Sequence, residues 1–329
     1  MRVLITGICG FIGHHIAAHL LEHTDWDIIG IDRLDHAGTC HRIEEIYDKH
    51  LYSNRMEFIF HDLRAGINDY IYERMNACEI NHVLHLAACT HVDRSIRNPV
   101  DCVMDNILGT VNVLEFLKDI NVERFVYFST DEVFGPAPPG VKYNEWDRYN
   151  SKNPYAASKA GAEELCLAYA NTYGLPVIIT HCMNAFGERQ NSEKFIPSTV
   201  KKILNGETIT IHSDETLTVP GSRHWLYAKN IAHAIHFILT SHKITCDKYN
   251  IVGTKEVNNL ELAQQIAKIM GEKLNYEMVD FHTSRPGHDL RYALSGGKLE
   301  KLGFKYPFDF ENSLVNTVKW YTENQEWLV

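Results

Sequence analysis

The sequence RVLITGICGFIG, residues 2–13, joins a short apolar run to three glycines that are spaced three residues apart. The apolar run at 2–6 predicts a buried β-strand, and the spacing of apolar residues at 12–21 predicts a helix directly after it. Glycines between a strand and a helix allow a tight turn and a close approach of the backbone to a pyrophosphate at the helix N-terminus. This segment therefore predicts the phosphate loop of a dinucleotide-binding sheet.

The end of the next apolar run indicates which dinucleotide the loop would take. This run, at 28–31, is followed by Asp32, 19 residues after Gly13. A carboxylate at this place suits the ribose 2′-hydroxyl of NAD and repels the 2′-phosphate of NADP. Arg33 follows and favours NADP instead, but we take Asp32 as the stronger signal and predict NAD. Asp62, after the third apolar run, is placed to meet the adenine, although an aspartate at a strand end is also common without a ligand.

Strands and helices alternate over the first half of the chain. Apolar runs and helical periodicity predict further strands at 56–61, 82–87, 125–129 and 177–182, and helices at 103–117 and 156–173. Strands that alternate with helices form parallel sheets, because a helix has to carry the chain back to the start of the next strand. We therefore predict an α/β fold with a Rossmann-like, doubly wound parallel sheet.

After Asn184 the pattern is less regular. Helices are expected at 195–204 and 260–270, a short strand at 209–212, and an extended segment followed by a helix at 224–240. We interpret this half as a smaller, mixed α/β domain that binds the substrate. The predicted division gives residues 1–187 to an NAD-binding domain, rejoined by about 223–245, and residues 188–222 and 246–329 to a nucleotide-sugar-binding domain.

Composition excludes several classes of protein. The chain of 329 residues carries a net charge of −10 and has no run of lysine and arginine, which argues against a nucleic-acid partner. No apolar stretch approaches the ~18 residues of a membrane span, and the N-terminus lacks the apolar region of a signal peptide.

The eight cysteines lack a Cys-x-x-Cys pair, so we expect free thiols in the cytoplasm. His15 and His19 share a helix face, but we expect no metal site.

Two short motifs carry the chemistry. Tyr155 and Lys159 are four residues apart in a predicted helix, so the phenol and the ammonium lie on one face. A nearby ammonium favours the phenolate, so we expect Tyr155 to accept a proton near neutral pH. Asp131 and Glu132 are adjacent carboxylates that a plain dehydrogenase does not need. Hydride chemistry with an additional acid and base indicates an oxidation followed by an elimination.

These motifs identify a relationship that extends nearly from end to end. The chain resembles the extended short-chain dehydrogenase/reductase family, and within it the nucleotide-sugar 4,6-dehydratases. Related epimerases and decarboxylases usually lack the adjacent Asp131–Glu132 pair. The segments that carry the resemblance are Phe11–Gly13, His85–Ala88, His91–Ser95, Ser129–Gly135, Tyr155–Lys159, Lys194–Pro197, Trp225–Tyr227, Arg285–Asp289 and Arg291–Tyr292.

The resemblance implies a reaction in three stages. Tyr155, helped by Lys159, would remove the proton of the carbon-4 hydroxyl while hydride passes to NAD, and Thr130 would hydrogen-bond that oxygen. Glu132 would then take the proton at carbon 5 while Asp131 protonates the departing hydroxyl at carbon 6. Hydride returns to carbon 6, which gives a 4-keto-6-deoxy sugar that remains attached to its nucleotide diphosphate.

The resemblance also implies the binding residues and the assembly. Substrate-binding candidates are Arg94, Asn184, Lys194, Arg223 and Arg285, each of which could instead have a structural role. A homodimer would form through helices at about 100–117 and 156–172. The cofactor residues implied are Gly7, Gly10, Phe11, Ile12, Gly13, Asp32, Asp62, Leu63, Ala87, Tyr155 and Lys159.

Three departures from the family pattern leave the substrate open. Cys89 stands where a glutamate is usual, Phe134 where a tyrosine is usual, and Ala185 where an asparagine is usual. All three are expected near the sugar, so the base and the sugar remain undetermined. The alternative activities are those of a 4-epimerase or a decarboxylase of the same family. A dinucleotide-binding protein without catalytic activity is disfavoured because Tyr155 and Lys159 are both present.

Overall fold

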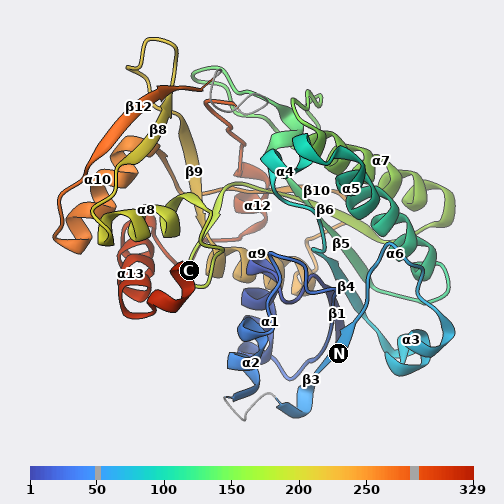
Figure 1. Cartoon of the computed structure of the whole chain (residues 1–329). Coiled ribbons are helices and arrows are strands. Elements are labelled where there is room, and N and C mark those ends of the chain that lie inside the picture. Colours follow the sequence, from blue (N-terminus) through green and yellow to red (C-terminus); the bar gives the residue numbers. More distant parts are fainter. Residues whose placement is uncertain (49–52, 282–288) are drawn as a thin grey trace.

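A seven-stranded parallel sheet forms the centre of the molecule (Figure 1). The computed structural model describes residues 1–48, 53–281 and 289–329. The strand order is β10-β6-β5-β4-β1-β2-β3, so the chain runs outward from β1 in both directions. The strands are β1 (Arg2–Thr6), β2 (Asp27–Asp32), β3 (Met56–Phe60), β4 (His82–His85), β5 (Arg124–Thr130), β6 (Val177–Cys182) and β10 (Lys248–Ile251).

Helices cover both faces of this sheet, because its strands are apolar on both sides. Two separate clusters of buried side chains lie between the sheet and the two helical layers. This arrangement confirms the predicted α/β fold class. One layer contains α1 (Phe11–His23), α2 (His41–Asp48), α9 (Ala228–Thr240) and α12 (Gly297–Leu302), and the other contains α3 (Asp69–Arg74), α6 (Gly109–Leu117) and α7 (Pro154–Tyr173).

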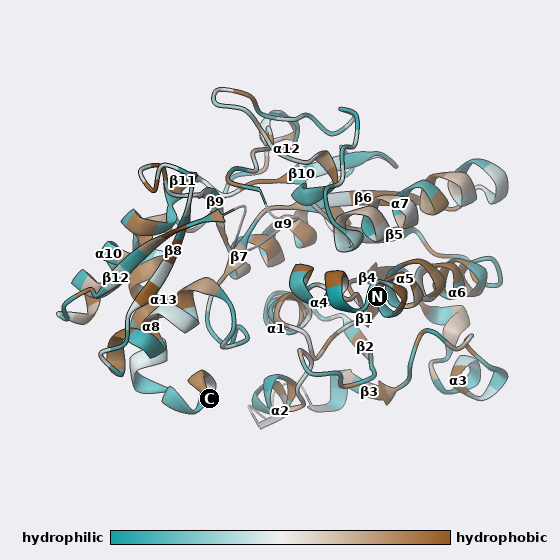
Figure 2. Ribbon diagram, turned by 45° about the horizontal axis from the view of Figure 1, so that its top comes forward, coloured by the Kyte–Doolittle hydropathy of each residue, from teal (hydrophilic) through white to brown (hydrophobic). Residues whose placement is uncertain are grey.

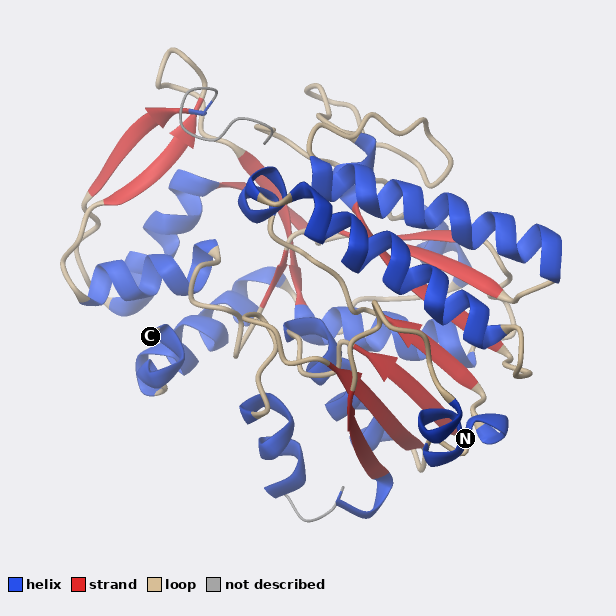
Figure 3. Cartoon of the chain, turned by 45° about the vertical axis from the view of Figure 1, so that its right-hand side comes forward, coloured by secondary structure: helices blue, strands red, loops and turns tan. Residues whose placement is uncertain are grey.

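The helix predicted at 103–117 is interrupted. A helix α5 (Pro99–Val103) leads into a π-helical turn, η3 (Met104–Leu108), and then into α6. Hydrophobic residues dominate this long stretch (Figure 2), which runs beside α7 in front of the sheet (Figure 3). Sequence periodicity does not reveal the turn, since a π-helical turn adds a residue without changing the apolar character of the segment.

The second half of the chain forms a smaller mixed region at the other side of the molecule (Figure 1). It has its own buried core, to which three helices contribute. Helices α8 and α10 agree with the two predicted here. The elements are β7 (Ala185–Phe186), α8 (Phe195–Leu204), β8 (Ile209–Ser213), β9 (Ser222–Tyr227), β11 (Lys255–Asn258), α10 (Asn259–Met270), β12 (Tyr276–Asp280) and α13 (Phe310–Glu323).

Several short elements complete the fold. They are α4 (Val92–Arg97), η1 (Ser53–Arg55), η2 (Ala77–Glu79), η4 (Asp131–Phe134) and η5 (Gln325–Leu328). The division into two domains stays a prediction, and β10 extends the large sheet although its sequence falls in the range assigned to the second domain. Within residues 1–48, 53–281 and 289–329, no helix has the length and apolar character needed to cross a membrane.

Candidate functional site

A cavity of about 830 Å³ lies at the carboxyl ends of the strands of the large sheet. Residues that follow β1, β2, β3, β4, β5 and β6 all contribute to its lining. This is the edge at which doubly wound sheets bind ligands, because the loops there diverge and the helices that follow present their N-termini. All predicted cofactor residues and all five predicted catalytic residues line this cavity.

The glycine loop has the shape that a pyrophosphate requires. Gly7 has a φ of +73°, and a Cβ placed there would come within 2.7 Å of the backbone nitrogen of Ala87. A Cβ on Gly13 would lie 2.3 Å from the carbonyl oxygen of Gly7. Gly10 precedes α1 and provides no side-chain cap, so the first N–H groups of the helix are open to an anion. The loop therefore fits the diphosphate of NAD.

Asp32 lies at the end of β2 beside this loop. Its carboxylate accepts hydrogen bonds from the backbone nitrogens of Cys9 at 3.0 Å and Leu34 at 2.9 Å. These bonds hold the carboxylate at the place expected for a partner of the ribose hydroxyls. Burial raises the pKa of Asp32.

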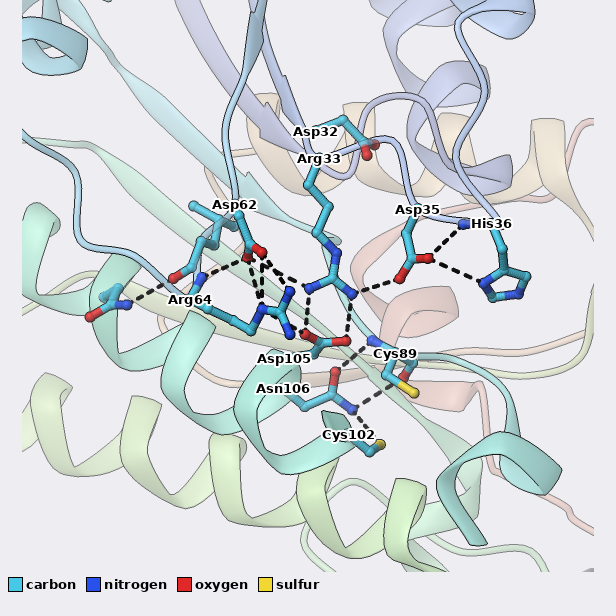
Figure 4. A network of polar contacts seen from close by, with 12 residues as sticks. Asp32, Arg33, Asp35, His36, Asp62, Arg64, Cys89, Cys102, Asp105 and Asn106 are labelled. Carbon is cyan, nitrogen blue, oxygen red and sulfur yellow. Dashed lines mark hydrogen bonds and ion pairs between the residues drawn. The ribbon is translucent and has the colours of Figure 1, made fainter. Parts of the chain in front are cut away.

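Asp62 and Leu63 line the same part of the cavity. The Asp62 carboxylate is 2.7 Å from the Arg64 guanidinium and 3.6 Å from that of Arg33 (Figure 4). Asp62 is therefore held by the charges of two arginines, independently of any contact with an adenine. Leu63 is buried within the apolar cluster on one face of the sheet.

The catalytic candidates begin where β5 ends. The Thr130 hydroxyl donates to Oδ1 of Asp131 at 3.1 Å and accepts from the backbone nitrogen of Glu132 at 3.3 Å. It thereby caps the short helix η4, which fixes the two carboxylates relative to the strand. Oδ2 of Asp131 is buried and has no hydrogen-bond partner within the described part of the chain.

Both carboxylates have a raised proton affinity. Burial, followed by the charge of Glu132, raises the pKa of Asp131 to about 7. Burial also raises the pKa of Glu132, against the opposing effect of a hydrogen bond from Asn153 and the charge of Arg223. A site that holds one protonated and one ionised carboxyl at neutral pH can act as acid and base together.

Tyr155 and Lys159 lie on α7 and are both buried. Burial, followed by the charge of Glu132, raises the pKa of Tyr155, while a hydrogen bond with Thr130 acts in the opposite direction. Burial lowers the pKa of Lys159 to about 8, and its ammonium lies 4.2 Å from the centre of the Tyr127 ring. Burial and Glu132 are therefore the largest effects on the pKa of Tyr155, and the role expected for Lys159 stays a prediction.

Two residues that were not among the predicted site residues hold Glu132. The side-chain nitrogen of Asn153 donates to Oε2 of Glu132 at 3.0 Å, and Asn153 also caps the N-terminus of α7. The hydroxyl of Tyr292 is 3.5 Å from the same Oε2. Asn153 thus ties the start of the helix that carries Tyr155 to the carboxylate. A signal was available, since an asparagine before Pro154 is typical of a helix N-cap.

The substrate candidates are placed differently. Arg94, Asn184 and Lys194 line the cavity, and Oδ1 of Asn184 is buried without a hydrogen-bond partner among the residues described. Arg223 does not belong to the lining. Its guanidinium donates to backbone carbonyls, including that of Asp289 at 2.6 Å. Its charge nevertheless acts to lower the pKa values of both candidate carboxyls, Asp131 and Glu132.

Arg285 and the three departures from the family pattern are placed in different ways. Arg285 falls in the range that the structure does not describe. Cys89 and Ala185 line the cavity. Phe134 is fully buried behind it, in a cluster that includes Met183 and Tyr292. The phenylalanine therefore acts on the site through packing.

A buried polar cluster lies behind the catalytic helix. Glu163, two helical turns after Tyr155, accepts hydrogen bonds from the hydroxyls of Ser129 and Tyr149. Nε2 of His181 is 3.1 Å from its carboxylate, and Nζ of Lys248 is 3.5 Å away. Sequence reasoning missed this cluster because its members come from five separate segments.

Comparisons with known proteins agree with this geometry. A family model described as GDP-mannose 4,6 dehydratase matches residues 4–317. A dTDP-glucose 4,6-dehydratase of Salmonella typhimurium is 35% identical, with 100% of this chain and 94% of the relative covered. A trifunctional protein of Arabidopsis thaliana, named for UDP-glucose 4,6-dehydratase among its activities, is 35% identical over 99% of this chain and 48% of its own length.

A solved structure is similar over nearly the whole chain. The dTDP-glucose 4,6-dehydratase of Streptomyces venezuelae, crystallised with NAD bound, superposes with a TM-score of 0.89. It is 34% identical, and the match covers 99% of this chain and 98% of the other.

Proposed function

The chain belongs to the GDP-mannose 4,6 dehydratase family, and we propose that its own substrate is dTDP-glucose. It is an NAD-dependent nucleotide-sugar 4,6-dehydratase. The observation that carries the proposed mechanism is the pair of buried Asp131 and half-buried Glu132, which lines one cavity with Tyr155. An enzyme that only oxidised and reduced carbon 4 would have no use for two carboxyls with raised pKa values.

Three side chains act on carbon 4 in this proposal. The hexose lies with its carbon-4 hydroxyl at Tyr155, which accepts the hydroxyl proton, and Thr130 donates a hydrogen bond to the same oxygen. Lys159 supplies positive charge on the same helix face. When NAD is bound, it supplies the exchange of a hydride with the sugar and a positive charge on its oxidised ring.

The carboxyls carry out the elimination. A ketone at carbon 4 acidifies the proton at carbon 5, and Glu132 removes it. Asp131, whose pKa of about 7 keeps it largely protonated below neutral pH, gives its proton to the hydroxyl that leaves carbon 6. Asn153 and Tyr292 hold Glu132 in position. Glu132 then returns a proton to carbon 5, and the hydride that the bound cofactor would supply adds to carbon 6, so carbon 4 remains a ketone in the nucleotide-linked product.

Recognition of the nucleotide diphosphate is assigned by position. Asn184 and Lys194 line the cavity, and Arg94 lies at its edge with half-exposed charge. We assign them, with Arg223 and Arg285, to the diphosphate and the sugar. Arginine suits this role because its planar group can bind two phosphate oxygens together.

Mass spectrometry of a panel of substrates tests the proposal. The purified protein, without added cofactor, is incubated separately with dTDP-, UDP-, GDP- and CDP-glucose. We expect dTDP-glucose to lose one water and to give a ketone that borohydride reduces. Preference for another nucleotide would overturn the assigned base, and no water loss from any of the four would overturn the glucose-type substrate.

We also propose that the protein forms a homodimer through α5, η3, α6 and α7. Large apolar side chains are exposed on this surface, among them Val100 at 71% and Val103 at 42%. Exposed apolar patches on globular proteins mark contact surfaces. Sedimentation analysis should give a dimer, and Val100→Glu together with Val103→Glu should give a monomer. A wild-type monomer would contradict the proposal.

The proposed location is the cytoplasm. All eight cysteines are free thiols, and Cys9, Cys102, Cys166 and Cys182 are buried. A reducing compartment preserves such thiols. Cell fractionation with an antibody to the chain tests this location.

A further inference from the structure

Five charged side chains meet at one end of the cavity (Figure 4). Arg33 directs both terminal nitrogens of its guanidinium at Asp105, with distances of 2.5 Å and 2.7 Å to the two carboxylate oxygens. The second nitrogen also donates to Asp35 at 2.7 Å. Arg64 binds Asp62 at 2.7 Å and lies 3.7 Å from Asp105. A two-bond contact of this kind is the strongest geometry available to an arginine and a carboxylate.

Asp105 reaches Arg33 because of the π-helical turn η3. Its side chain is 10% exposed and lines the cavity. The next residue, Asn106, is buried and faces elsewhere: its amide nitrogen donates to the Ser158 hydroxyl at 2.8 Å and its oxygen accepts from the backbone nitrogen of Cys89 at 2.8 Å. The turn therefore presents Asp105 to the cavity and Asn106 to the catalytic helix. Such turns are frequent at functional sites.

The charges of this group are unfavourable to an additional phosphate. Four carboxylates, those of Asp32, Asp35, Asp62 and Asp105, surround two guanidinium groups. Arg33 would be the natural partner of a 2′-phosphate, since it directly follows the residue that meets the ribose. Both of its terminal nitrogens already bind carboxylates, so its charge is balanced.

We propose that Asp105, assisted by Asp35, withholds Arg33 from anionic ligands and so selects NAD against its 2′-phosphorylated form. Asp105 is a specificity residue in this view, and Arg33 is a latent phosphate site. The hydrogen bond to Asp105, the largest effect on the group, raises the pKa of Arg33, which agrees with a strongly held guanidinium. The inference depends on the cavity holding a dinucleotide and not on the identity of the sugar.

Calorimetric titration with NAD and NADP tests this role. The dissociation constants of both are measured on cofactor-depleted full-length protein, wild type and Asp105→Asn. Asparagine keeps the size of the side chain and removes its charge. We expect the affinity for NADP to rise about tenfold, since a freed guanidinium can form a charge-assisted bond to the phosphate. The affinity for NAD should change much less.

Two further variants identify the cause of any gain. Asp101→Asn removes a carboxylate from α5 that lines the same cavity but forms no ion pair with Arg33 in the described structure, so it should leave the preference unaltered. Arg33→Ala in the Asp105→Asn background should abolish the gain. An equal gain from Asp101→Asn, or a gain that survives the loss of Arg33, would overturn the proposal.

A variant at Asp35 serves as a control for effects on folding. Asp35 is 55% exposed, so Asp35→Asn should fold normally and should raise the affinity for NADP in the same direction by a smaller factor. If neither aspartate variant binds NADP more tightly, the proposal is wrong. Dehydration of the sugar is not part of the measurement, so a failure of the proposed substrate would leave this result unaffected.

Discussion

Asp131 and Glu163 are both buried carboxyl groups, yet their pKa values move in opposite directions. They receive hydroxyl hydrogen bonds from adjacent residues of β5, Asp131 from Thr130 and Glu163 from Ser129. Burial, followed by the charge of Glu132, raises the pKa of Asp131 to about 7. Burial alone would raise that of Glu163 as well, but His181, followed by Lys248 and Ser129, lowers it to about 2.

The comparison teaches that neighbours, and not burial, separate a reactive acid from a structural one. Glu163 has two hydroxyl donors, a histidine and an ammonium around it, which together favour its charged form. Asp131 has only one hydroxyl donor to favour its charged form, and burial together with the adjacent carboxylate favours its neutral form. A carboxyl that keeps its proton near pH 7 can give it away in a reaction, whereas Glu163 can only hold its neighbours together.

Removing the reactive carboxyls should have the largest effect. We expect Asp131→Asn and Glu132→Gln each to reduce the rate of water loss by about 10² to 10⁴-fold, because each deletes a proton transfer in the elimination. Mass spectrometry of the nucleotide sugar measures the rate. The melting temperature is the control, since both variants should remain folded. Turnover above a tenth of the wild-type rate in either variant would remove that carboxyl from the mechanism.

Neutralising the structural carboxyl should mainly affect stability. Glu163→Gln leaves Lys248 buried without its counter-charge, so we expect a loss of about 3–5 kcal/mol in the free energy of unfolding. Urea denaturation followed by circular dichroism gives the value. Glu164→Gln, at the exposed neighbouring position on α7, is the matched control and should change little. Equal effects of the two substitutions would show that the cluster does not depend on the charge of Glu163.

The dependence of stability on pH should differ in sign between the two groups. The pKa of Asp131 is higher in the folded chain than in the unfolded one, so its contribution is full below about pH 4 and is lost as the pH rises through about 7. The pKa of Glu163 is lower in the folded chain, so its contribution is present above about pH 4.5 and is lost as the pH falls through about 2.

Melting temperatures measured from pH 5 to pH 8 test the first sign. Asp131→Asn should gain stability over the wild type as the pH rises, by on the order of 2 kcal/mol at pH 8. Glu163 stays ionised over this range, so the difference between Glu163→Gln and the wild type should remain constant. A difference for Asp131→Asn that does not change with pH would contradict the raised pKa.

The smallest effect is expected for a single donor to Glu163. Tyr149→Phe removes one hydroxyl that contacts both Glu163 and Lys248 but leaves the charges in place. We expect a loss of about 1–2 kcal/mol, measured by the same urea denaturation. Tyr70→Phe, at a position that is 70% exposed, serves as the comparison. A loss as large as that of Glu163→Gln would mean that the hydrogen bond matters more than the charge.

Features that depend on neighbours in sequence were predictable. The strand, loop and helix of residues 2–23 follow from one apolar run, three glycines and a helical spacing, and Asp32 follows from its place after the second strand. The adjacency of Asp131 and Glu132 was sufficient to predict an elimination. A signal for α13 was also present, since Phe310, Leu314, Val318 and Tyr321 are spaced as one helix face and are all buried, but it was not used.

Features that depend on distant neighbours were not predictable. Glu163 and Lys248 lie 85 residues apart and Arg33 and Asp105 lie 72 apart, and no local pattern connects them. The raised pKa of Tyr155 was not predictable either, because the spacing to Lys159 is visible in the sequence while burial is not. The π-helical turn was missed for the same reason, since its position depends on contacts of Asn106 made across the fold.

The π-helical turn η3 has a consequence for any redesign of this enzyme. Its single inserted residue sets the rotation of α5 against α6, so a deletion within Met104–Leu108 would turn Asp105 and Asn106 away from their partners in one event. Cofactor preference and the support of Ser158 would be lost together. Mutant libraries that exchange side chains at fixed length can change cofactor preference and the support of Ser158 separately. Libraries that vary the length of the helix here would lose both at once.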